Sequence, residues 1–270
     1  MIRTVQAVFC LPLLLVVVEI PSLAQTTAAP IRRISAPESF YDDASITAPG
    51  SLGISLGYGY GSVTAGHDQS FPSFDLSLGV NTRLEVDASS GYARSKFESL
   101  RIAGLQDSYF GGKVLLVTQG KFRPAIAIKP EIEVLGEPSL ANNLMAPKRL
   151  NFVSPLEIEK SSSWSRTYYT AGYHTRGIFF QSLVNELDLW SGFVPSVVVA
   201  YSRLTHELRT VSDFGLNRSR LDVLGSASFA LGDGWSMYAG GGTSVGRTDP
   251  NSLKYEISVG IGFNVRLRRY

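Results

Sequence analysis

A two-residue alternation between apolar and small or polar residues runs through most of the chain beyond Gly50. It is clearest near the C-terminus, where every second residue from Tyr255 to Leu267 is Tyr, Ile, Val, Ile, Phe, Val or Leu. The residues between them are Glu, Ser, Gly, Gly, Asn and Arg. A period of two places successive side chains on opposite faces of a β-strand. The sequence therefore predicts strands that each have one apolar face.

The pattern predicts about twelve strands. Their expected spans are 51–61, 71–80, 82–93, 105–118, 122–135, 150–159, 164–174, 177–187, 193–206, 218–231, 235–246 and 253–267. Connections at Asn81, 119–121 and 232–234 are short, whereas those at 62–70, 94–104, 136–149 and 207–217 are longer. Outer-membrane barrels alternate short periplasmic turns with longer outer loops. The spacing predicts that both ends of the barrel chain lie in the periplasm.

Alternation also occurs in soluble β-sandwiches. The residues on the two faces of each strand must therefore distinguish a soluble sandwich from a membrane barrel. Nearly every expected strand has an apolar face of its own, and several of these faces have aromatic residues near one end. This arrangement is typical of a lipid-facing band with aromatic girdles. We therefore expect an all-β fold, a single antiparallel up-and-down transmembrane β-barrel in the bacterial outer membrane.

The N-terminus predicts export. Arg3 precedes an apolar run from Ala7 to Val18, and Ser22-Leu23-Ala24 places small residues before a cleavage site at Gln25. A membrane anchor is the alternative, but the run is shorter than the ~17–25 residues of a spanning helix. The expected organisation is a signal peptide at 1–24, a periplasmic N-terminal tail at 25–49 and an outer-membrane barrel at 50–270. The one cysteine, Cys10, falls within the signal peptide.

A family resemblance rests on the segment from Gly104 to Lys113, which reads GLQDSYFGGK, and on the alternation that follows Pro124. It resembles outer-membrane transporters associated with the meta-pathway of phenol degradation. Members typically show Gly-x-Gly-Asp, then Gly-x-Lys, then an apolar strand ending near Pro-Thr-Gly. Here Gln106 replaces the second glycine, and Leu135-Gly136-Glu137 replaces the final motif. The resemblance implies transport of small solutes, hydrophobic ones included, and transfers no substrate-binding residue.

Charged residues on neighbouring strands are the candidate site. The alternation places Asp107, Lys113, Lys129, Glu131 and Glu133 on faces that point into the lumen. Fixed charges in a narrow pathway select solutes. Alternatively, the same residues form a structural ion-pair network, because small barrels are packed by side chains. Spacing alone leaves both interpretations open.

No residue pattern indicates catalysis, a metal or a cofactor. His67, His174 and His206 lack a neighbouring serine in a His-x-Ser arrangement, and we expect them to be solvated near outer loops. The glycine-rich segment 57–61 precedes no helix and so is not a phosphate loop. A net charge of +2 gives no nucleic-acid footprint.

The expected partners are outer-membrane lipid, the barrel-assembly machinery and a small-molecule solute. We expect the barrel-assembly machinery as a partner because the last strand ends near Tyr270, and an aromatic residue at the end of the last strand resembles the signal that this machinery reads. Phe263 is the alternative aromatic residue for this signal. Two functions remain from the sequence. One is a channel or facilitator for small solutes, and the other is a plugged structural or adhesive barrel without transport activity.

Overall fold

The computed structural model describes residues 42–63, 66–97, 100–137, 149–175, 177–190, 192–205, 219–246 and 253–267. The predicted signal peptide, most of the predicted tail and His206 lie outside these ranges. The strands, in chain order, are β1 (Ser51–Val63), β2 (Gly66–Gly79), β3 (Leu84–Phe97), β4 (Leu100–Leu105), β5 (Ser108–Val117), β6 (Ala125–Ile128), β7 (Glu131–Val134), β8 (Leu150–Val153), β9 (Leu156–Ser161), β10 (Ser165–His174), β11 (Ile178–Leu187), β12 (Phe193–Leu204), β13 (Ser219–Gly232), β14 (Trp235–Ser244) and β15 (Leu253–Arg266). Within the described residues, no helix is long and apolar enough to cross a membrane.

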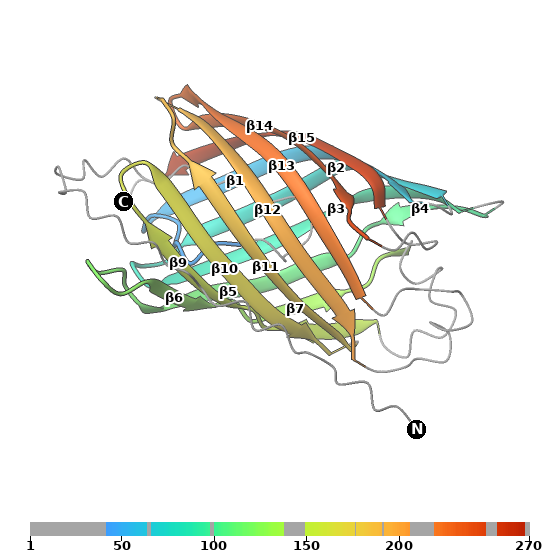
Figure 1. Ribbon diagram of the computed structural model, residues 1–270, viewed down its shortest axis with the longest axis horizontal. Coiled ribbons are helices and arrows are strands. Elements are labelled where there is room, and N and C mark those ends of the chain that lie inside the picture. Colours follow the sequence, from blue (N-terminus) through green and yellow to red (C-terminus); the bar gives the residue numbers. More distant parts are fainter. Residues whose placement is uncertain are drawn as a thin grey trace.

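These segments form one closed antiparallel barrel of twelve strands (Figure 1). β1 pairs with β2 on one side and with β15 on the other, so the first and last strands meet. Three strands are each divided in two: β4 from β5 at residues 106–107, β6 from β7 at Lys129-Pro130, and β8 from β9 at Ser154-Pro155. Proline has no N–H to donate to a strand partner, which explains the second and third interruptions. The predicted fold class is confirmed.

The outer surface of the barrel is apolar. Ile257 and Val259 on β15 are 51% and 43% exposed, and Ile132 on β7 is 50% exposed. Ser258, which lies between the first two, belongs to the inner face. A closed barrel satisfies its backbone hydrogen bonds internally, so such a surface is stable in hydrocarbon and unfavourable in water. The barrel is therefore a transmembrane barrel of the outer-membrane type.

Aromatic pairs mark the two ends of the apolar band. At one end the rings of Trp235 and Phe263 have centroids 4.6 Å apart. At the other end Tyr60 and Tyr255 stack with centroids 6.0 Å apart. Tyr and Trp concentrate where hydrocarbon meets headgroups, so the two pairs fit the two interfaces of a bilayer.

The chain enters and leaves the barrel at the same end, where Leu267 N donates to Gly50 O at 2.7 Å. The two longest connections between strands, 135–149 and 205–218, are at the opposite end, which identifies this end as periplasmic. At the outer end the predicted loops 62–70 and 94–104 are wrong. Strand pairing there continues to Val63↔Gly66 and Phe97↔Leu100. These stretches lack an apolar face, and in Figure 1 β2, β3 and β4 project beyond the other strands at this end, so we infer that they extend past the lipid band.

Candidate functional site: a charged lumen and the segment held against its wall

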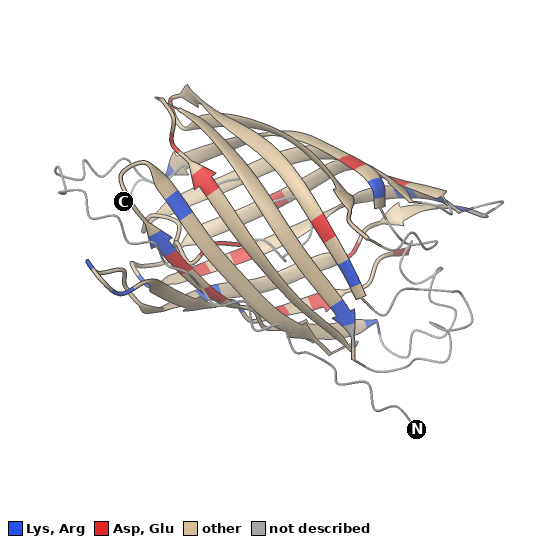
Figure 2. Cartoon of the chain, viewed as in Figure 1, with Lys and Arg blue, Asp and Glu red and all other residues tan. Residues whose placement is uncertain are grey.

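Four of the five charged residues singled out from the sequence lie on the inner face of one wall. Lys113 is on β5, Lys129 lies between β6 and β7, and Glu131 and Glu133 are on β7. The Lys113 and Glu133 side chains are 0% exposed, whereas the outward Ile132 between the two glutamates is half exposed. Acidic and basic residues lie together in the wall that contains β5 to β10 (Figure 2).

Asp107 lies elsewhere, in the interruption between β4 and β5. Its carboxylate accepts a hydrogen bond from Gly136 N at 2.8 Å. Gln106 N beside it donates to Gly91 O at 3.0 Å, so the chain stays attached to β3 through the interruption. Asp107 therefore fastens the beginning of the connection between β7 and β8, near the outer end of the wall.

The segment Asp42–Pro49, which precedes β1, lies inside the barrel against this charged wall. Asp42 is its main anchor: one carboxylate oxygen is 3.0 Å from Lys113 Nζ and the other is 2.9 Å from Lys129 Nζ. Each lysine also pairs with the wall itself. Lys113 Nζ is 3.3 Å from Glu157, and Lys129 Nζ is 3.0 Å from Glu131. The segment therefore shares its cations with carboxylates of the barrel.

Asp43 forms a second anchor, which attaches the segment to β10. Its carboxylate is 2.7 Å from the guanidinium of Arg166 on β10, which also pairs with Glu159 at 2.8 Å. Burial raises the pKa of Asp43, but the charges of Arg166 and Lys113 outweigh this effect and hold the pKa at about 2. Asp43 is therefore ionised at neutral pH.

Hydrogen bonds fix the backbone of the segment in the same position. Thr170 on β10 donates its hydroxyl to Asp42 O at 2.6 Å. Nearer β1, Thr47 N donates to the Glu85 carboxylate at 2.7 Å, and the Thr47 and Ser77 hydroxyls are 3.2 Å apart. The segment thus crosses the inner face of the barrel from β10 to β2 and β3.

Carboxylates outnumber cations where the described segment meets the inner faces of β3 and of β5 to β11. Three cations are present: Lys113, Lys129 and Arg166. Nine carboxylates accompany them: Asp42, Asp43, Glu85, Asp87, Glu131, Glu133, Glu157, Glu159 and Glu186. No group of three or more His, Cys, Asp or Glu among the described residues has a metal-binding arrangement.

The opposite wall is lined by small residues. Gly57 on β1 and Gly260 on β15 face inward, and the ring of Tyr238 on β14 lies across both. A Cβ at Gly260 would collide with that ring, so glycine is required there. Ser258 on the same inner face remains partly exposed to water. The lumen is therefore asymmetric, with a packed charged wall facing a wall of small residues.

His174 corrects the expectation of a solvated histidine. It is 0% exposed, with Nδ1 3.8 Å from a Glu133 oxygen and its ring 5.4 Å from the Phe180 ring. Pairing of β10 with β11 continues to His174↔Ile178, so this residue occupies an inward strand position. His67 lies on β2, where its ring stacks on Tyr60.

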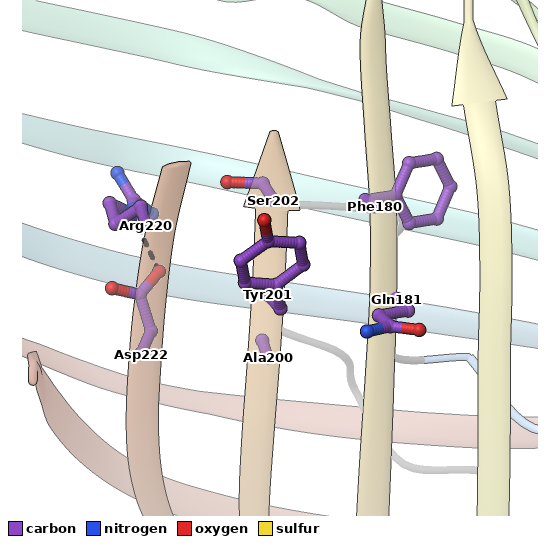
Figure 3. Close-up of a pocket in the computed structure, with 7 residues that line it drawn as sticks. All are labelled: Phe180, Gln181, Ala200, Tyr201, Ser202, Arg220 and Asp222. Atoms are coloured by element: carbon purple, nitrogen blue, oxygen red, sulfur yellow. Dashed lines mark hydrogen bonds and ion pairs between the residues drawn. The ribbon is translucent and has the colours of Figure 1, made fainter. Parts of the chain in front are cut away.

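A small pocket lies across β11, β12 and β13 (Figure 3). Its charged pair is Arg220 and Asp222, whose side chains approach to 2.6 Å. The other oxygen of Asp222 accepts the hydroxyl of Ser244 at 2.6 Å. Arg220 and Asp222 are both on β13, and the bond to Ser244 links β13 to β14, so Asp222 has a structural role in the wall.

Comparison with known proteins supports the fold. No protein-family model matches the chain, and no curated protein matches it. Among solved structures, an outer membrane channel from Pseudomonas putida F1 matches with a TM-score of 0.62 and 8% identity, covering 84% of this chain and 100% of that one. The KdgM porin matches with a TM-score of 0.48 and 11% identity over 77% of this chain and 98% of that one. The chain thus has the fold of a known outer-membrane channel.

Proposed function

We propose that the protein is an outer-membrane channel for small solutes, in which the segment Asp42–Pro49 is a removable plug. The observation that carries the proposal is the way in which the plug is held. Lys113, Lys129 and Arg166 each pair with the plug and also with a carboxylate of the barrel wall. Departure of the plug therefore leaves no wall cation without a partner, which would otherwise be the main cost of breaking buried ion pairs.

The lining also indicates which solutes the channel favours. Solutes that pass the plug level meet a wall in which carboxylates exceed cations and an opposite wall of glycine and serine. Such a pathway favours small cationic or polar solutes. Hydrophobic solutes, which the family resemblance implies, would have to pass the same charges. A permanently plugged structural barrel is the competing function, and it predicts no conductance.

The test is reconstitution into planar bilayers under a potassium chloride gradient. We expect brief openings with a reversal potential that indicates preference for potassium over chloride. Replacing Glu131 and Glu157 by Gln should move the reversal potential towards chloride while the protein stays folded. Asp233→Asn is the matched control: it removes a carboxylate from an exposed periplasmic turn at a positive φ of 49°, which Asn tolerates.

Two results would contradict the proposal. A folded barrel that shows no conductance under any applied voltage would favour the plugged structural function. Equal shifts for Asp233→Asn and for the double variant would mean that the lumen wall does not set ion preference.

A further inference from the structure

A row of basic residues crosses three strands at the outer end of the barrel. Lys96 on β3 lies directly opposite His67 on β2 and directly opposite Arg101 on β4. Arg94 lies two residues before Lys96 and so on the same face of β3. We call His67, Arg94, Lys96 and Arg101 the basic row. Adjacent strands are ~4.8 Å apart, so the row crosses roughly 10 Å of the surface, and its permanent positive charges are Arg94, Lys96 and Arg101.

The basic row faces outward. Alternate residues of β3 share one face, and the row has the parity of Val86 and Tyr92, which are 48% and 38% exposed. Ser95, between Arg94 and Lys96, is 5% exposed and belongs to the inner face. Lys96 itself is exposed. The row therefore continues the lipid-facing surface beyond its apolar part.

Its height along the barrel corresponds to the headgroups of the outer leaflet. Val86 lies near the periplasmic end of the apolar band, and Lys96 is ten residues further along the strand, or about 33 Å. At a strand tilt of ~40° this is roughly 25 Å along the barrel axis. The apolar band of such barrels is also ~25 Å tall. Lys96 thus lies where the hydrocarbon of the outer leaflet ends.

The charges of the row call for an anion from outside the sheet. Like charges directly opposite each other on neighbouring strands destabilise a sheet. The described outward positions of β1 to β5 contain no Asp or Glu. Aromatic rings flank the row: the Arg94 guanidinium is 5.8 Å from the centre of the Tyr92 ring, and the Tyr60 ring stacks on His67. Such rings anchor a barrel at the level of lipid headgroups.

We propose that the basic row binds the phosphate groups of the phosphorylated glycolipid, lipopolysaccharide, that forms the outer leaflet. The row is continuous with the surface that contacts lipid, and it lies at headgroup height on the outer side. Arginine and lysine are the side chains that bind phosphate most strongly, and arginine can do so with two parallel hydrogen bonds. Outward-facing Arg94, Lys96 and Arg101 would hold a lipid phosphate against the tyrosine rings.

The test measures binding of defined lipid A to the purified protein in detergent by native mass spectrometry. Bisphosphorylated lipid A is compared with lipid A from which both phosphates have been removed. The protein should bind the first and not the second. Each basic residue near an anionic lipid surface contributes a factor of about five, so Arg94→Gln, Lys96→Gln and Arg101→Gln together should weaken binding about a hundredfold.

The matched control is Lys121→Gln, which removes one positive charge from a periplasmic turn. Its binding should equal that of the wild type, and Lys96→Arg should retain most of the affinity. Heat-modified gel mobility checks that each variant is folded, and the single variant Lys96→Gln, with an expected fivefold loss, is used if the triple variant is not. Equal binding by wild type and folded variants would overturn the proposal. So would equal affinity for phosphorylated and dephosphorylated lipid A, or full competition by millimolar inorganic phosphate.

Discussion

Removing the negative charge of Asp42 should open the channel. In the structure this carboxylate is 3.0 Å from Lys113 Nζ and 2.9 Å from Lys129 Nζ, and the residue is 7% exposed. Breaking a buried ion pair by removing one partner costs ~3–5 kcal/mol. The lower end applies to Asp42→Asn, because both lysines keep carboxylates of the wall, Glu157 and Glu131. A cost of about 3 kcal/mol lowers the ratio of plugged to open protein roughly 150-fold.

Single-channel recording in planar bilayers measures that ratio as the fraction of time spent open. Asp42→Asn should increase the open fraction without changing the conductance of each opening, since the open pathway is the same. Asp222→Asn is the matched control, because Asp222 is also a buried carboxylate but pairs with Arg220 on another wall. An open fraction equal to that of the wild type would refute the assignment of Asp42 as the anchor. An equal increase in Asp222→Asn would show that lumen charge, and not plug attachment, controls opening.

Further outcomes test the lipid face, the lumen and the plug. Ile257→Arg places a charge in the lipid band and should destabilise the barrel by ~2–4 kcal/mol, whereas Ser258→Asn should be mild, as measured by urea unfolding in lipid vesicles. Gly260→Ser shares the inner face of Ser258 but should be destabilising, because its Cβ collides with the Tyr238 ring. The folded-state pKa of Asp43, about 2, is below its ordinary 3.8, so its stabilisation of about 2 kcal/mol is present above pH 4 and lost towards pH 2. Open fraction should therefore rise as the pH falls through that interval; no rise would show that Asp43 does not hold the plug.

Part of the site could be predicted from the sequence. Alternation along 123–135 placed Lys129, Glu131 and Glu133 on one strand face, because side-chain direction in a strand follows from parity alone. The burial of His174 was missed, because it is the last residue of its expected strand and we expected the end of that strand to be solvated. The charged partners of the lumen wall were also missed. Lys113 and Glu157 are 44 residues apart in sequence and meet only because β5, β6 and β9 are neighbours.

The sequence by itself determined the class of fold, the strand number and the face of each strand, because all three follow from a local period of two and from the spacing of turns. Only the tertiary structure decided what the inner faces do. Asp42 and Asp43 come from a stretch without any periodicity, and nothing local directs them into the lumen. They lie there because closure of β1 on β15 brings the chain before Gly50 to the mouth of a barrel whose wall holds buried Lys113 and Lys129 and partly buried Arg166. Ion pairs between residues that are far apart in the sequence then hold the plug in place, and a local stretch of sequence does not reveal such pairs.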